Sequence, residues 1–142
     1  GTYPNVSLYF VKEACQMCRK APCVSVCPTK ASYYNEDGVV LVDEDKCVGC
    51  LYCMTACPYD ARFLNNETGA VDKCTFCYEL KVSKGEKPAC VSTCVGGALI
   101  FGDLNDPLSQ ASQFLAKHKG EVRKPELGTH PGVYYIYEGV VK

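Results

Sequence analysis

Short runs of apolar residues, each bounded by turn residues, divide the first half of the chain into strand-sized segments. Residues 31–34 and 39–42 are joined by Asn35-Glu36-Asp37-Gly38, and the Asp-Gly ending of this turn favours a tight hairpin. Residues 62–64 and 70–73 repeat the pattern around a second polar turn. The sequence therefore predicts two short β-hairpins, one after the other.

The last third of the chain has a different pattern. Residues 98–102 are an apolar run that predicts another strand. Asp106-Pro107 is typical of a helix start, and apolar residues near a 3.6-residue period follow over residues 108–119, with Gly120 placed to end the helix. Residues 133–137 predict a final strand with aromatic side chains on both faces, which favours a segment that docks on another surface.

Composition explains why these elements need additional stabilisation. The 142 residues include 12 Cys but only five Phe, two Met and no Trp, so one small domain with a modest apolar core is expected. The 15 basic and 16 acidic residues nearly cancel, which disfavours a polybasic nucleic-acid or lipid binder. No apolar run approaches the roughly 18 residues of a membrane span.

The cysteines form three quartets, and no cysteine lies outside them. The second quartet has the C-x2-C-x2-C-x3-C-P spacing of bacterial ferredoxins, and the first has the same spacing with two extra residues between its second and third cysteines. The quartets are Cys15, Cys18, Cys23 and Cys27; Cys47, Cys50, Cys53 and Cys57; and Cys74, Cys77, Cys90 and Cys94.

This spacing has a physical reason in cluster geometry. A tight C-x2-C-x2-C loop can wrap three iron corners of a cubane, whereas the fourth cysteine points away and ligates the neighbouring cluster. We therefore expect a crossed pair of [4Fe–4S] clusters. One cluster would take Cys15, Cys18, Cys23 and Cys57, and the other would take Cys47, Cys50, Cys53 and Cys27.

Other uses of cysteine compete with this interpretation. Paired C-x2-C knuckles also bind zinc, but zinc has no use for the third cysteine or the Cys-Pro ending, so the third quartet is the better zinc candidate. A disulfide framework fits the cysteine content, but adjacent C-x2-C pairs do not close readily on themselves. A purely structural cluster is a further alternative, although two or three closely set clusters favour an electron path.

Polar residues near the quartets suggest no catalysis by the chain itself. Gly96-Gly97 is isolated, no cysteine is left over to act as a nucleophile, and His118 and His130 have no cysteine partner at ligand spacing. Tyr59, Tyr52 and Phe76 are expected to shield clusters from water. Six basic residues would offset cluster charge, although a solvated surface charge is the simplest interpretation of each: Lys12, Arg19, Lys20, Lys46, Arg62 and Lys73.

Several segments resemble the iron–sulfur subunit of the dimethyl-sulfoxide-reductase family, which includes the electron-transfer subunits of polysulfide, thiosulfate and tetrathionate reductases. The resemblance covers nearly the whole chain and is strongest for the cysteine runs. The matching segments are residues 1–5, 15–28, 45–50, 57–62, 101–107 and 127–135.

The resemblance implies an electron-transfer subunit that relays electrons between a polytopic, quinone-interacting membrane subunit and a molybdopterin-containing catalytic subunit. It further implies a hetero-oligomeric, membrane-associated respiratory complex on the periplasmic, outer face of the cytoplasmic membrane, with the cytoplasmic face as the alternative. A soluble polyferredoxin and a metal-stapled interaction module are the alternatives in other classes.

The family usually carries four quartets, so the three seen here suggest that an N-terminal cluster-binding segment precedes Gly1. Three [4Fe–4S] clusters are expected from this chain, or four with such a segment. A further alternative is that one of the clusters is [3Fe–4S]. Without the segment the third quartet would close one cluster alone, and with it the third quartet would share clusters with the missing quartet. Val95 replaces the usual Pro after Cys94, which leaves the direction of Cys94 open.

Together these observations predict a small α+β fold of tandem bacterial-ferredoxin-like modules, with short β-hairpins and a C-terminal helix and strand. Residues 1–102 would bind the clusters, with the crossed pair in residues 11–65 and the third motif in residues 66–102. Residues 103–142 would form an extension that docks on partner subunits.

Overall fold

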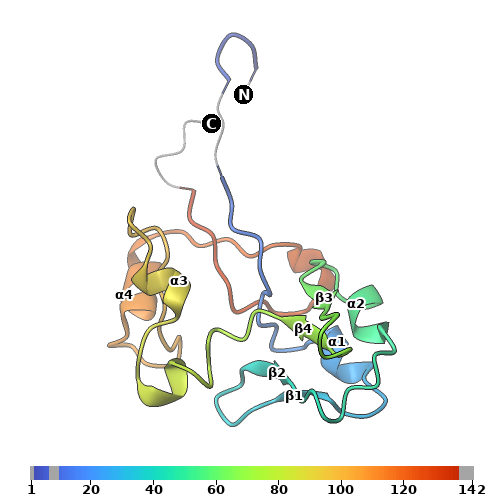
Figure 1. Ribbon diagram of the computed structural model, residues 1–142. Coiled ribbons are helices and arrows are strands. Elements are labelled where there is room, and N and C mark those ends of the chain that lie inside the picture. Colours follow the sequence, from blue (N-terminus) through green and yellow to red (C-terminus); the bar gives the residue numbers. More distant parts are fainter. Residues whose placement is uncertain (1, 7–9, 138–142) are drawn as a thin grey trace.

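The computed structural model, which describes residues 2–6 and 10–137, consists of short elements joined by long loops (Figure 1). No helix in these two ranges is both long and apolar enough to span a bilayer. Residue 1 and residues 138–142 of the predicted extension lie outside the described residues. The elements in chain order are α1 (Pro22–Ser25), β1 (Ser32–Tyr34), β2 (Val40–Val42), α2 (Tyr52–Thr55), β3 (Arg62–Leu64), β4 (Val71–Lys73), the 3-10 turn η1 (Val82–Lys84), α3 (Ala89–Ser92), α4 (Gln110–Lys117) and the 3-10 turn η2 (Pro125–Leu127).

Both predicted hairpins are confirmed. Strand β1 pairs antiparallel with β2, and β3 pairs antiparallel with β4, each as a separate two-stranded sheet. In the first turn, the Asn35 side-chain oxygen accepts from the Val39 amide at 2.7 Å, and Gly38 adopts a φ of 75°. These local bonds explain why the turn sequence was sufficient to predict the hairpin.

The elements fall into two groups (Figure 1). Helices α1 and α2 lie beside the two hairpins, whereas α3 and α4 lie together on the other side of the molecule. The buried core belongs to the first group and includes three of the cysteines. Its members are Met17, Cys18, Ala21, Cys23, Val39, Val40, Leu41, Cys53, Tyr59 and Val71.

The predicted strand over residues 98–102 is wrong, because this segment is irregular in the structure. No other strand pairs with it among the described residues, and the backbone of Leu99 and Ala98 lies close enough to Cys94 to lower the pKa of that thiol. Phe101 packs edge-on against Phe76, with ring centroids 5.4 Å apart. The apolar run therefore packs beside the third quartet without forming a strand.

The predicted strand over residues 133–137 is also wrong in extent. Only Tyr135 pairs, as an isolated antiparallel bridge with Glu121. This bridge holds the segment against residues just beyond α4. A strand needs a neighbouring ladder, and among the described residues both hairpins already pair within themselves.

Helix α4 confirms the predicted helix but begins later than expected. Its N-cap is Ser109, whose hydroxyl accepts from the Ser112 amide at 3.2 Å; Asp106 instead accepts from the Leu108 amide at 2.8 Å in the preceding turn. The helix ends at Lys117 with His118 as C-cap, so Gly120 is not its cap.

Gly120 has a different role, because it allows a close approach. A Cβ there would lie 2.6 Å from Leu115 Cδ2 and 3.2 Å from Tyr134 Cδ1. The glycine thus lets the C-terminal segment pass directly over α4.

The described part of the C-terminal extension packs on the first cysteine run of the same chain. The Arg19 amide donates to the His130 carbonyl at 2.9 Å, and the Gly132 amide donates to the Gln16 carbonyl at 2.8 Å. The Gln16 amide side chain, which is 1 % exposed, donates to the Tyr135 hydroxyl at 2.9 Å. Docking of the extension on partner subunits stays a prediction.

Candidate iron–sulfur sites

The third cysteine of every quartet has the same place in a short helix. Cys23, Cys53 and Cys90 are the second residues of α1, α2 and α3. In each quartet the amide of the fourth cysteine then donates to the carbonyl three residues before it, at 3.2 to 3.3 Å. The quartets therefore share this local backbone, although their grouping into tandem ferredoxin modules stays a prediction.

The turn after each fourth cysteine also recurs. The third residue beyond it is left-handed in all three quartets, with φ values of 56° at Lys30, 51° at Asp60 and 60° at Gly97. The first two quartets have Pro directly after the fourth cysteine, whereas the third has Val95. The turn forms in either case, so Val95 does not alter the local path of the chain after Cys94.

Three thiols of the first quartet lie near a thiol of the second. Burial raises the pKa of Cys18 from 9.0 to about 11, and the nearby charges of Cys15, Cys23 and Cys57 add to the rise. A hydrogen bond from the Thr129 hydroxyl opposes it. Bound iron would hold these thiols as thiolates. Cys57 thus lies near the first three cysteines, which is the neighbourhood that the crossed assignment requires.

The complementary set lines one cavity. Cys27 from the first quartet faces the same space as Cys47, Cys50 and Cys53, and the rest of the wall is largely apolar. The further lining residues are Thr29, Ala31, Ser32, Val42, Val48, Leu51 and Val71. An apolar wall excludes water and lowers the local dielectric, which is one of the factors that set cluster potentials.

Each hairpin contributes a backbone amide to a sulfur of this cavity. The Ser32 amide of β1 lies 3.4 Å from Cys27 Sγ, and the Val71 amide of β4 lies 3.5 Å from Cys47 Sγ. Burial raises the pKa of Cys27, but hydrogen bonds from Ser32 and Thr29 outweigh it, so the pKa is lowered overall. Amide donors stabilise the anionic form that a metal ligand needs.

Gly49 shapes the loop that carries Cys47 and Cys50. Its φ is 64°, and a Cβ there would lie 3.0 Å from the carbonyl oxygen of Gly69 in the turn between β3 and β4. The loop therefore needs glycine both for the left-handed backbone and for the close approach of the neighbouring hairpin.

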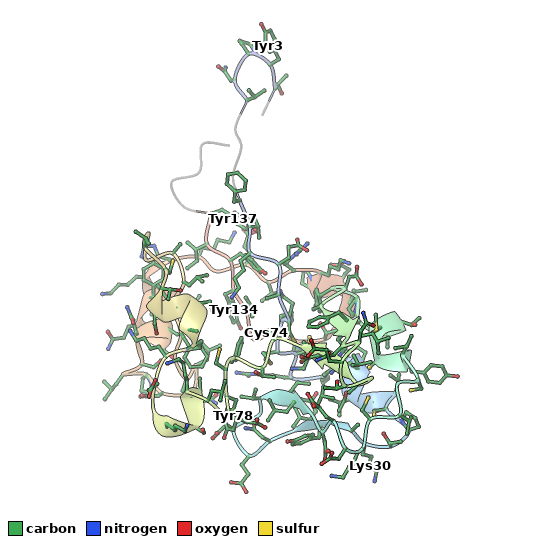
Figure 2. The ribbon with its side chains drawn as sticks, in the orientation of Figure 1. Tyr3, Lys30, Cys74, Tyr78, Tyr134 and Tyr137 are labelled. Carbon is green, nitrogen blue, oxygen red and sulfur yellow. The ribbon has the colours of Figure 1, made fainter. Side chains whose placement is uncertain are left out.

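The third quartet begins at the end of β4 and continues to α3, which carries Cys90. Figure 2 shows Cys74 where the chain leaves β4 and crosses toward α3 and α4. Hydrogen bonds from the amides of Leu99 and Ala98 lower the pKa of Cys94. The Lys12 ammonium lies 3.3 Å from Cys90 Sγ, which brings the segment before the first quartet next to the third.

Two of the six basic residues near the quartets are buried. Arg62 and Lys73 are each 4 % exposed. The other four are exposed, as expected for solvated surface charges: Lys12, Arg19, Lys20 and Lys46. Sequence alone did not separate the two groups, because the difference depends on which face of the second hairpin packs inward.

Thr129 was not among the residues that sequence reasoning assigned to a site. Its hydroxyl lies 2.5 Å from the Tyr59 hydroxyl and opposes the rise that burial causes in the pKa of Cys18. Tyr59 is buried and Phe76 is partly buried, as shielding of a cluster requires, but Tyr52 is 65 % exposed, so the expectation is wrong for Tyr52. The only signal for Thr129 was its place in the resembling segment 127–135.

The donor sets fit iron–sulfur clusters. All twelve cysteines are free thiols, four of them line one cavity, and amides are placed to donate to sulfur. Across residues 2–6 and 10–137, no group of three His, Cys, Asp or Glu side chains is close enough together to hold a single metal ion.

Comparison with known proteins supports iron–sulfur binding. A family model described as "4Fe-4S dicluster domain" matches residues 6–104. One relative, a component of the polysulfide reductase of Wolinella succinogenes, is 49 % identical over 132 residues, which cover 93 % of the sequence. Another, a component of the tetrathionate reductase of Salmonella typhimurium, is 52 % identical over 134 residues, again 93 % of the sequence.

A third relative, the thiosulfate reductase electron transfer subunit of Salmonella typhi, is 54 % identical over 97 residues, or 68 % of the sequence. The matches cover 69 %, 53 % and 50 % of the lengths of these three relatives. The cysteine spacing, the thiol-lined cavity and these matches lead to one conclusion: the chain belongs to the family of 4Fe–4S iron–sulfur subunits of the dimethyl-sulfoxide-reductase and polysulfide-reductase type.

Proposed function

We propose that this chain is an electron-transfer subunit that relays electrons through [4Fe–4S] clusters between a quinone-interacting membrane subunit and a molybdopterin-containing catalytic subunit. The observation that carries the proposal is the cavity in which Cys27 of the first quartet meets Cys47, Cys50 and Cys53 of the second. Spacing alone predicted this crossing, which is the arrangement of a two-cluster ferredoxin. On this proposal the chain carries electrons and does not transform a substrate itself.

The proposed ligand sets follow the crossed assignment. Cys15, Cys18, Cys23 and Cys57 hold one cluster, and the electrostatic proximity of these four thiols supports the set. The second cluster is held by the four cysteines that share the cavity: Cys27, Cys47, Cys50 and Cys53.

For the third quartet we propose a third cluster held by Cys74, Cys77, Cys90 and Cys94. The family resemblance offers the alternative that these cysteines share clusters with others outside the 142 residues. The contact between Lys12 and Cys90 supports this alternative, because the contact places the segment before Cys15 next to the third quartet.

The protein's own residues perform three tasks on this proposal. When bound, a [4Fe–4S] cluster supplies a one-electron carrier whose potential depends on hydrogen bonds to sulfur, nearby charge and exposure. The Ser32 and Val71 amides stabilise thiolate charge, and the apolar wall around Cys47 and Cys53 excludes water. The segment over residues 129–132 covers the first quartet.

The partners and location are proposed from the family. A protein in this role would join a hetero-oligomeric respiratory complex at the membrane, on its outer face, with the cytoplasmic face as the alternative. Exposed apolar side chains beside the second quartet offer a contact surface for such partners: Val48 is 67 % and Tyr52 65 % exposed.

Iron and acid-labile sulfide per chain, measured on anaerobically purified protein together with its intact mass and EPR spectrum, test the proposal. About twelve irons with magnetically coupled [4Fe–4S] signals are expected for three clusters. About sixteen irons in a heavier chain would favour the shared third quartet. Zinc without labile sulfide would overturn the electron-transfer role and support a metal-stapled scaffold.

A further inference from the structure

Two cations lie directly opposite each other in the second hairpin. Arg62 of β3 is the register partner of Lys73 of β4, so both side chains are on the same face of the sheet. Both residues are 4 % exposed. Like charges at opposed positions destabilise a sheet, and buried charge is costly without compensation, so this pair needs a reason.

The protein alone does not neutralise the pair. Arg62 Nη1 donates to the Ser32 hydroxyl at 2.9 Å, while Nη2 is buried without a hydrogen-bond partner. Lys73 Nζ donates to the carbonyls of Val40 and Cys74, the latter at 3.0 Å. Among the described residues neither cation forms an ion pair with a carboxylate.

The negative charges near the pair come from cysteine. Burial raises the pKa of Cys23, and the nearby Arg62 guanidinium opposes that rise, which places Arg62 close to this thiol. Burial lowers the pKa of Lys73 and the Arg62 charge adds to this, whereas Cys15 and Cys23 of the first quartet and Cys74 of the third favour its charged form. Lys73 directly precedes Cys74, which Figure 2 labels, so the pair lies close to cysteines of both the first and the third quartet.

We propose that Arg62 and Lys73 act as a buried cationic pair that raises the reduction potential of the cluster held by Cys15, Cys18, Cys23 and Cys57. This inference rests on the proposed function. One-electron reduction makes a cluster one unit more negative, and fixed cations in a low-dielectric interior stabilise that added charge. The electron comes from a redox partner, or from dithionite in the test below. Arg62 is a permanent charge, which suits a fixed electrostatic role.

An EPR-monitored redox titration of the purified holoprotein tests the pair. The variants are Arg62→Gln and Lys73→Gln, and Arg62→Lys keeps the charge while changing the hydrogen-bond geometry. Arg19→Gln is the matched control, because Arg19 is exposed and directly follows Cys18. The signal of the relevant cluster is identified as the one that Cys18→Ser alters.

The expected result is a ratio of reduced to oxidised cluster about tenfold lower at a fixed potential in Arg62→Gln and in Lys73→Gln, or about 59 mV for one electron. Arg62→Lys and Arg19→Gln should stay much closer to wild type. Wild-type potentials in both Gln variants, with full iron and sulfide, would overturn the cationic pair. If Arg62→Gln does not retain iron, the shift in the reduction potential of Lys73→Gln alone tests the proposal, and a wild-type potential in that variant would overturn it. Wild-type protein without iron and sulfide would instead overturn the proposed function.

Discussion

The hydroxyls of Tyr59 and Thr129 lie 2.5 Å apart, although 70 positions separate the two residues in the sequence. Tyr59 follows the second quartet, and Thr129 belongs to the C-terminal extension. The Thr129 carbonyl also accepts from the Lys20 amide, within the first quartet, at 3.0 Å. One threonine therefore ties the extension to both runs of the crossed pair, which makes residues 129–132 part of the cluster environment.

Removing this hydroxyl should weaken the attachment of the extension. Thr129→Val keeps the shape but loses the bond to Tyr59, at a cost of about 1 kcal/mol of stability. Thermal unfolding of the holoprotein under anaerobic conditions measures the change. Thr129→Ser keeps a hydroxyl and serves as the control. Equal midpoints for Thr129→Val and wild type would show that the contact does not hold the extension.

The crossed ligand sets make a spectroscopic prediction. Cys27→Ser and Cys50→Ser should alter the same EPR signal, because both residues line one cavity. Cys57→Ser should instead alter the signal that Cys18→Ser alters. Spectra of the four single variants, each normalised to its iron content, make the comparison. An effect of Cys27→Ser on the Cys18 signal alone would contradict the crossing.

Gly49→Ala should damage the second cluster site more than Gly38→Ala. Both positions are left-handed, with φ values of 64° and 75°, so each substitution costs about 1–2 kcal/mol through the backbone alone. Only Gly49 also brings a new Cβ to 3.0 Å from a backbone carbonyl, whereas nothing lies within 4 Å at Gly38.

The rate of iron loss to a chelator, followed by absorbance, separates the two glycine variants. Faster loss in Gly49→Ala than in Gly38→Ala is the expected outcome. Equal rates would mean that the hairpin turn moves away from the loop without cost.

The cap of α4 makes a stability prediction. Ser109→Ala removes the bond to the Ser112 amide and the bond to the Asp103 carbonyl, and should cost about 1 kcal/mol. Asp106→Ala should cost less, because Asp106 lies outside the helix. Thermal midpoints of the two variants make the test, with Ser109→Asn as the variant that retains a capping group. A larger loss of stability in Asp106→Ala than in Ser109→Ala would instead support Asp106 as the N-cap, as the sequence predicted.

Local patterns were enough to predict the hairpins and the helix. The Asp-Gly turn at residues 37–38 closes β1 and β2 through bonds within the turn, and the apolar period over residues 108–119 marks α4. The strand predicted over residues 98–102 failed because no second strand pairs with it among the described residues. Apolar alternation indicates strand propensity, but a strand also requires a partner that lies elsewhere in the fold.

The sequence by itself determined the three cysteine quartets, their ferredoxin spacing and the expected crossing of Cys27 and Cys57, because ligand spacing is a local property of the chain. Tertiary structure alone decided which charges are buried. Arg62 and Lys73 look like the other basic residues in sequence, and only the packing of the second hairpin separates them from exposed Arg19 and Lys46. Burial depends on contacts between distant segments, and those contacts decide the electrostatic environment of the cluster sites.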